Sequence, residues 1–136
     1  MSEAKVINSW EVKPFSLDDS YDSRMLLDNI VAGAETVQIN EGTLRGGGKT
    51  EESVHKDNEI YYAVKGEAIL TLGDKSSCIK QGSLVFIPGG VSHALENKSQ
   101  TEDFVLLTFW MDAKQNDVYE LRMKAWGKSF KTIHED

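Results

Sequence analysis

Short strand-like segments, separated by residues typical of tight turns, fill the middle of this 136-residue chain. Glu35–Leu44 alternates apolar and polar side chains, a period of two that predicts a half-buried strand. The connections around Gly66 and Gly73 have the chemistry of β-hairpin turns. Strands of this length and spacing favour an all-β sandwich or barrel. The expected strands are Glu35–Leu44, Glu59–Val64, Glu67–Leu72, Ser76–Lys80, Ser83–Pro88, Ser92–Asn97 and Phe104–Trp110.

The two ends of the chain have a different character. Val6–Val12 is expected as a short N-terminal strand, and Ser16–Asp28 as an irregular segment that leads into a strand. Asn116–Phe130 has apolar residues near helical spacing after an Asn-Asp start, which predicts a short C-terminal helix. We therefore expect a single domain over residues 1–136, with its barrel core at 35–110, a strand segment at 1–34 and a tail or helix at 111–136.

The overall composition limits which kinds of binding partner and which cellular compartment are compatible with this chain. The formal net charge of −7 weighs against nucleic acid or an anionic membrane surface as a partner, because both reward clustered Lys and Arg. A single cysteine, Cys78, excludes an internal disulfide and fits a reducing compartment. The sequence shows no run of about 20 apolar residues and no apolar signal-peptide core at its start. We expect a cytoplasmic protein.

Candidate metal ligands lie around the start of the strand expected at Glu59. Ser53 and His55 are two residues apart and share one face of an extended segment, and the same alternation extends to Glu51. A short bend can return the Glu59 carboxylate to the same cavity, and His93 lies on a strand that can face it. Two imidazoles and one carboxylate form a set that divalent metals bind with coordination positions left open.

The glycines around these residues complete a recognisable spacing. The first segment contains Gly47, five residues, Ser53, one residue, His55, three residues, Glu59, six residues and Gly66. In the cupin family the corresponding motif is G-x5-H-x-H-x3,4-E-x6-G. This chain therefore resembles that motif at every fixed position except Ser53, where the family has its first histidine.

A second segment has the spacing of the other cupin motif, G-x5-P-x-G-x2-H-x3-N. It contains Gly82, five residues, Pro88, one residue, Gly90, two residues, His93, three residues and Asn97. On both motifs the chain is identified as a member of the cupin superfamily, a small single-domain barrel protein. The resemblance implies a double-stranded β-helix, or jelly roll, whose mouth holds a small ligand.

The resemblance also implies a ligand set for a divalent metal ion, namely His55, Glu59 and His93. Ser53 leaves the fourth position open to three interpretations. A three-ligand centre is retained, Glu51 or the adjacent Glu52 replaces the missing histidine, or the site binds substrate without metal. Alternation favours Glu51 as the replacement. The sequence does not choose among Fe, Mn, Ni and Zn.

Further residues are candidates for catalysis and substrate binding. Tyr61 shares the face of Glu59 and is a candidate acid, and His93 is a candidate general base. The candidate substrate contacts are Gln38, Asn40, Ser53 and Asn97.

Three functions from different classes follow from these residues. The first is a metal-dependent enzyme that acts on a small polar metabolite, with oxygenase-like chemistry favoured because two histidines and one carboxylate form a facial triad. The second is a metal-free isomerase or lyase, and the third is a module that binds a small ligand without turnover. The resemblance further implies a homodimer, to which the Val6–Val12 segment with Trp10 would contribute.

Overall fold

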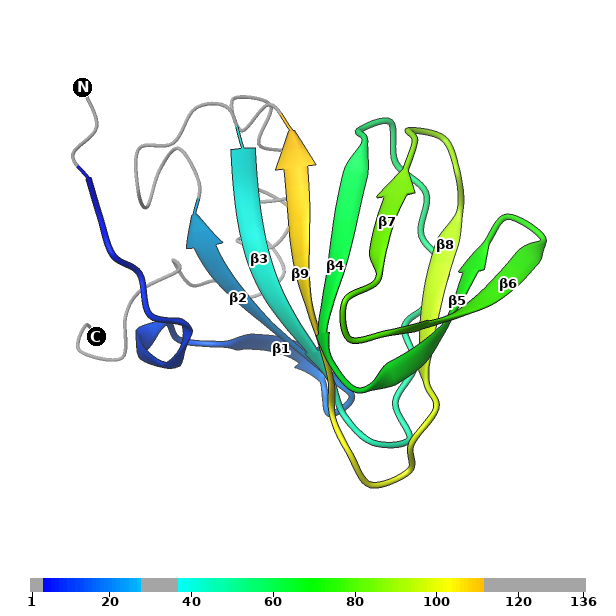
Figure 1. The fold of residues 1–136 in the computed structure, drawn as a ribbon, viewed down its shortest axis with the longest axis horizontal. Helices are drawn as coiled ribbons and strands as arrows, with labels where there is room; N and C mark the ends of the chain where they lie inside the picture. Colours follow the sequence, from blue (N-terminus) through cyan, green and yellow to red (C-terminus); the bar gives the residue numbers. More distant parts are fainter. Residues whose placement is uncertain (1–3, 28–36, 112–136) are drawn as a thin grey trace.

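The structure, a computed structural model, describes residues 4–27 and 37–111. In these ranges it contains one short 3-10 helix and nine strands (Figure 1). The elements are η1 (Ser9–Glu11), β1 (Phe15–Asp18), β2 (Tyr21–Leu27), β3 (Val37–Leu44), β4 (Glu59–Lys65), β5 (Glu67–Leu72), β6 (Lys75–Lys80), β7 (Leu84–Ile87), β8 (His93–Asn97) and β9 (Phe104–Met111). The helix expected at Asn116–Phe130 lies outside the described residues. Among the described residues, no helix has the length and apolar character needed to cross a membrane.

The strands form two antiparallel sheets that wrap into a jelly-roll barrel. The larger sheet has the order β1-β2-β3-β9-β4-β7, and the smaller has the order β6-β5-β8. Strands distant in the sequence are therefore neighbours: β3 pairs with β9 over its whole length, from Val37 opposite Met111 to Leu44 opposite Phe104. The all-β jelly-roll expectation is confirmed.

Alternation along the strands builds the core. Every second residue of β3 and of β9 is buried, and the buried set of β9 begins with Phe104 and Leu106. These side chains pack against residues from the other strands, including Leu44, Leu70 and Ile87. A period of two places one face of each strand in the interior, which is the geometry that the sequence pattern predicts.

The connection between β4 and β5 depends on a glycine. Gly66 has φ of +84°, a left-handed conformation that costs little only without a side chain. An added Cβ would also lie 2.6 Å from the carbonyl oxygen of Asp103. This turn carries the chain from the larger sheet to the smaller one, so Gly66 helps to close the barrel.

One expectation for the N-terminal part is wrong, and another is confirmed only in its second half. Val6–Val12 forms no strand: the backbone N–H of Glu11 donates to the carbonyl of Asn8, and this local bonding closes the turn η1. Ser16–Asp28 was expected to begin irregularly, yet Phe15–Asp18 and Tyr21–Leu27 pair as antiparallel strands. Several residues of these two strands have polar side chains with a weak intrinsic strand propensity. They adopt the strand conformation because pairing with the neighbouring strand outweighs that propensity.

Candidate metal centre

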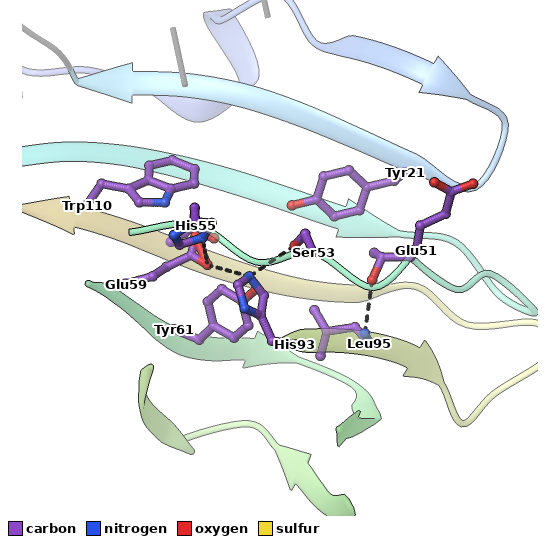
Figure 2. A pocket seen from close by; sticks show the side chains of 11 residues that line it. Tyr21, Glu51, Ser53, His55, Glu59, Tyr61, His93, Leu95 and Trp110 are labelled. Atoms are coloured by element: carbon purple, nitrogen blue, oxygen red, sulfur yellow. Dashed lines mark hydrogen bonds and ion pairs between the residues drawn. The ribbon is translucent and has the colours of Figure 1, made fainter. Parts of the chain in front are cut away.

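A cavity of about 300 Å³ opens between the two sheets (Figure 2). Strands β2, β4, β8 and β9 contribute to its walls, together with the segment that connects β3 to β4. A volume of this size is at the lower end of the range for small-molecule sites and equals about ten water molecules at about 30 Å³ each. The lining residues are Tyr21, Thr50, Glu51, Ser53, His55, Glu59, Tyr61, His93, Leu95, Thr108 and Trp110.

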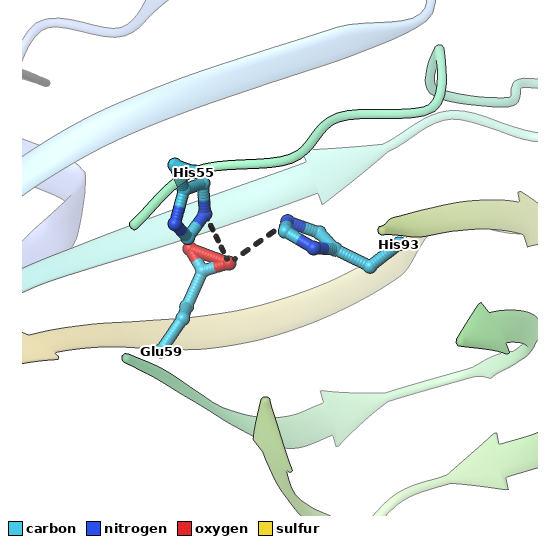
Figure 3. A group of neighbouring side chains, drawn as sticks. All are labelled: His55, Glu59 and His93. Carbon is cyan, nitrogen blue, oxygen red and sulfur yellow. Dashed lines mark ion pairs between the residues drawn. The ribbon is translucent and has the colours of Figure 1, made fainter. Parts of the chain in front are cut away.

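Three of the lining residues form a compact cluster of possible metal ligands, here called the His-Glu-His cluster (His55, Glu59 and His93). One ligand atom from each lies within 4.8 Å of the others. Nε2 of His93 is 3.3 Å from Oε1 of Glu59, and Nε2 of His55 is 3.6 Å from the same oxygen (Figure 3). Glu59 and His93 are only 3% and 5% exposed, so two of the three side chains are held within the barrel.

Local structure explains how these side chains meet. Glu59 is the first residue of β4 and takes an inward position of its alternating pattern, and His93 does the same at the start of β8. His55 lies in the connecting segment, which is tied to β8 by an isolated bridge between Ser53 and His93. The carbonyl of His55 also accepts a hydrogen bond from the backbone N–H of Gly90 at 2.8 Å. The segment is therefore anchored at Ser53 and at His55 itself.

The backbone sets the tautomer of both imidazoles. Nδ1 of His55 lies 2.9 Å from the carbonyl oxygen of Asp57, and Nδ1 of His93 lies 3.0 Å from that of Val91. A carbonyl oxygen only accepts, so each Nδ1 carries the proton. In the neutral rings both Nε2 atoms then present a lone pair to Glu59. Backbone carbonyls commonly orient metal-ligating histidines in this way.

The buried oxygen of Glu59 provides a test of whether the cluster fits a cation. Oε1 is fully buried and has no hydrogen-bond donor when both rings are neutral. Its two neighbours are the lone pairs of His55 Nε2 and His93 Nε2, so three electron-rich atoms face a common point. A buried carboxylate without a donor is costly, whereas a divalent cation at this point satisfies all three groups. The residues therefore fit a metal ion.

Electrostatics within the cluster favour protonated imidazoles and an ionised carboxylate. The pKa of His55 is raised, chiefly by its interaction with Glu59. Burial is the largest influence on His93 and lowers its pKa, but the contact with Glu59 and the Val91 carbonyl outweigh burial, and the net pKa is raised. Burial likewise acts to raise the pKa of Glu59, yet the two imidazoles together hold that pKa below its ordinary value.

Ser53, which stands at the missing fourth ligand position, and Glu51, the favoured replacement ligand, lie at different distances from the cluster. The Ser53 hydroxyl is 3.2 Å from Nε2 of His93. Glu51 lines the cavity, but it is exposed and its carboxylate points away from the cluster (Figure 2). Among the described residues, the group of converging ligand atoms does not include Glu51.

The remaining predicted site residues divide into two groups. Tyr61 lines the cavity, and its ring meets that of His93 edge-on with centroids 6.2 Å apart. Gln38, Asn40 and Asn97 are buried but are not among the lining residues. Asn40 accepts a hydrogen bond from the Ser23 hydroxyl.

Asn97 makes three hydrogen bonds to the backbone. Its Nδ2 donates to the carbonyls of Leu44 and Glu102, at 2.9 and 2.8 Å, and its Oδ1 accepts from the N–H of Ser99 at 2.9 Å. The structure thus places this side chain between the end of β3 and the β8–β9 connection rather than in the cavity.

Sequence reasoning missed five residues of the cavity wall: Tyr21, Thr50, Leu95, Thr108 and Trp110. Figure 2 shows Tyr21 and Trp110 along one wall, with Tyr61 across the cluster from them. The burial of Ser23 and Met25 shows the alternation of β2, and this period of two in the sequence was the signal that could have identified Tyr21 as part of a strand.

Comparison with known proteins points to one family. The family model described as "Cupin domain" matches residues 40–110. An uncharacterized protein of Methanocaldococcus jannaschii is 32% identical over 89 residues, which are 64% of this chain and 70% of that protein. An uncharacterized protein of Streptomyces coelicolor is 32% identical over 57 residues, or 42% of this chain, and the match spans only about half (54%) of that relative.

Solved structures share the fold at lower identity. A predicted oxalate decarboxylase from Thermotoga maritima superposes with a TM-score of 0.71 at 24% identity, covering 79% of this chain and 99% of that chain. The polyketide cyclase RemF from Streptomyces resistomycificus gives a TM-score of 0.72 at 21% identity, covering 80% of each chain. At these identities the similarity establishes the jelly-roll fold alone.

Proposed function

This chain belongs to the cupin family, and we propose that it is a metalloenzyme whose His-Glu-His cluster holds a divalent first-row metal ion. The observation that carries the proposal is the convergence of two Nε2 lone pairs on the buried, donor-less Oε1 of Glu59. Two imidazoles and one carboxylate on one side of an ion leave other coordination positions open toward the cavity. A small polar metabolite is the substrate class that a cavity of about 300 Å³ admits.

The metal, when bound, supplies Lewis-acid polarisation of a substrate oxygen or, if it is iron, activation of O2. The residues of the chain then bind and orient the substrate. Tyr61 is adjacent to His93 and offers a phenolic hydroxyl that can donate a proton to a developing oxyanion. The rings of Tyr21 and Trp110 form an apolar wall against which a small molecule can pack.

Oxygenase-like chemistry is our preferred reaction class. Its support is the composition of the cluster, because two histidines and one carboxylate are the facial ligand set of non-haem iron oxygenases. The proteins of similar fold include a polyketide cyclase and a predicted oxalate decarboxylase, so fold similarity does not decide between reaction classes. The metal found in the protein directs the substrate search: iron toward oxygenase reactions, and zinc, manganese or nickel toward isomerases and lyases.

Elemental analysis of the untagged protein tests the proposal. We expect a first-row metal near one per chain in the wild type and its loss in His93→Ala and Glu59→Gln. Cys78→Ala is the matched control, because Cys78 is an exposed thiol on β6 and, among the described residues, is not in the cluster. Absence of metal after reconstitution with each ion in turn would reject the metalloenzyme.

A metal-free isomerase or lyase is the second candidate, and Ser53 is the observation that favours it. A hydroxyl stands beside His93, and the pKa of His93 is raised by Glu59 and the Val91 carbonyl despite its burial. His93 as general base and Tyr61 as general acid would then act without an ion. Turnover that persists in excess chelator and is lost in Tyr61→Phe would favour this candidate. Ligand binding without turnover across a substrate panel would favour the non-catalytic module.

We also propose that the chain forms a homodimer through the outer face of β4 and β7. Tyr62 and Val64 point outward from β4. Leu84 and Phe86 point outward from β7, and their exposed fractions are 69% and 58%, respectively. Tyr62 lies directly opposite Leu84 in the strand register, so these side chains form one apolar patch. The outer face of an antiparallel sheet is usually polar, and an apolar patch favours contact with another protein surface.

A further inference from the structure

The hydroxyl of Ser53 lies against the ligand atom of His93. Oγ is 3.2 Å from Nε2, the same atom that faces Oε1 of Glu59 at 3.3 Å. Because Nδ1 of His93 donates to the Val91 carbonyl, Nε2 of the neutral ring has a lone pair and no proton. When the ring is neutral, the Ser53 hydroxyl is therefore the donor and the Nε2 lone pair is the acceptor.

The backbone keeps the two residues in this relationship. The N–H of Ser53 donates to the carbonyl of His93 at 3.0 Å, and the N–H of His93 donates to the carbonyl of Ser53 at 2.9 Å. This reciprocal pair is an antiparallel bridge, which fixes both Cα atoms opposite each other. Replacing the hydroxyl leaves both backbone bonds intact, so a Ser53→Ala chain keeps the local fold.

We infer that Ser53 lowers the affinity of the centre for a metal ion, because its hydroxyl competes with the ion for Nε2 of His93. The inference rests on the proposed metal centre and adds a regulation of its affinity. An imidazole lone pair accepts either one hydrogen bond or one metal bond, so the bond from Ser53 must break before the ion binds. A neutral hydrogen bond is worth roughly 2- to 10-fold in an equilibrium constant. The residue at position 53 therefore helps to set the affinity of the centre for a metal ion, although it is not itself a ligand.

The test is a Co²⁺ titration of the metal-free protein, followed by the visible absorption of the bound ion in competition with a chelator. The titrations use a pH at which NMR shows both imidazoles of each variant to be neutral. We expect Ser53→Ala to bind Co²⁺ roughly 2- to 10-fold more tightly than the wild type. Ser53→Thr retains the hydroxyl on the same bridged backbone and is expected to match the wild type.

A cavity hydroxyl elsewhere provides the matched control. Thr50 lines the same cavity, and its Oγ1 accepts a hydrogen bond from the N–H of Leu95 at 2.9 Å. We expect Thr50→Val to leave the Co²⁺ affinity unchanged. A second readout needs no metal: the Nε2 nitrogen resonance of His93 should move in Ser53→Ala and stay in place in Ser53→Thr.

The outcomes separate this inference from the metal centre itself. Unchanged or weaker binding in Ser53→Ala, with wild-type binding that depends on His93, overturns the inference and leaves the metal centre standing. Weaker binding in particular would show that the hydroxyl supports the ion. If the wild type fails to bind Co²⁺, or binds it no more tightly than His93→Ala does, the metal centre is rejected and the inference is rejected with it. The nitrogen resonance then still reports whether the hydrogen bond exists.

Discussion

The phenol of Tyr21 lies directly over Gly42, and this contact shapes one wall of the cavity. An added Cβ at Gly42 would lie 2.7 Å from Cζ of Tyr21, closer than real side chains approach. Tyr21 belongs to β2 and Gly42 to β3, with Ser23 paired opposite Gly42 in the register between the two strands. A glycine inside a strand often marks a close approach of this kind. Here it makes room for the Tyr21 ring in the cavity that also contains the His-Glu-His cluster.

We expect Gly42→Ala to destabilise the protein by about 1–3 kcal/mol, because the Tyr21 ring must move to accommodate the methyl group. Urea unfolding of the two single variants and of the double variant Tyr21→Ala/Gly42→Ala measures the coupling. With the ring removed, the alanine at position 42 should be tolerated or slightly stabilising, since it restricts the unfolded chain. An equal cost of Gly42→Ala with and without Tyr21 would show that the contact is not the cause.

The cluster could be predicted from the sequence because its residues occupy fixed positions of two motifs. His55 and Glu59 are four residues apart in the first motif, His93 is in the second, and the alternation of the two strands places Glu59 and His93 on inward faces. The cavity wall could not be predicted in the same way. Trp110 and Thr108 reach the cavity because β9 lies between β3 and β4, and such strand order is a long-range property of the fold.

The same limit applies at polar positions. Asn40 is a candidate substrate contact if the face of its strand points inward; that face is buried, and the hydroxyl of Ser23 on the neighbouring strand donates a hydrogen bond to the Asn40 side chain. Which strand lies beside β3 is not readable from β3 alone. At the N-terminus the Val6–Val12 segment is expected as a strand, whereas the N–H of Glu11 donates to the carbonyl of Asn8 and closes a local turn.

Glu59→Gln removes the charge while keeping the volume of the buried side chain. Loss of an outer-shell partner lowers metal affinity by up to about 100-fold. We expect a larger fall for Glu59→Gln, because this change removes the charge of a direct ligand. The pKa values of His55 and His93 should fall as well, since Glu59 acts to raise both. Calorimetry and NMR titration measure the two effects. Glu51→Gln serves as the control, and an equal loss of affinity in that variant would identify Glu51 as a ligand.

The metal-free and metal-loaded proteins should respond oppositely to pH. The folded-state pKa values of His55 and His93 lie above the ordinary 6.5, so their stabilisation is complete below that pH and is lost as pH rises through the raised values. The pKa of Glu59 lies below 4.5, so its contribution is present above that pH and is lost on acidification through the lowered value. The cluster therefore stabilises the metal-free fold most between 4.5 and 6.5.

Metal binding needs both Nε2 lone pairs, so the affinity should rise with pH through the raised pKa values of His55 and His93. The stabilisation by excess Zn²⁺, measured as the shift in the urea midpoint relative to a chelator-treated sample, should grow over the same range in which the metal-free protein loses stability. A stabilisation by Zn²⁺ that is independent of pH would contradict protonated imidazoles in the metal-free cluster.

Asn97→Ala distinguishes a structural role from a substrate contact. The Asn97 amide donates hydrogen bonds to the carbonyls of Leu44 and Glu102 and accepts one from the N–H of Ser99. We expect a loss of about 2–4 kcal/mol in the free energy of unfolding, because buried backbone groups lose their partners. Co²⁺ affinity of the folded variant should be unchanged. A stable Asn97→Ala protein with impaired ligand binding would instead assign the side chain to the substrate.

Phe86→Glu tests the proposed dimer at the outer face of β4 and β7. Phe86 is 58% exposed and pairs with Ile60 in the strand register, so a carboxylate placed there would be desolvated in an apolar interface but solvated in a monomer. We expect light scattering coupled to size exclusion to give a dimer for the wild type and a monomer for the variant at the same concentration. Ser77→Glu, an exposed position on β6 of the other sheet, is the control and should remain dimeric. A wild-type monomer at high concentration would reject the dimer, and a dimeric Phe86→Glu would place the interface on another surface.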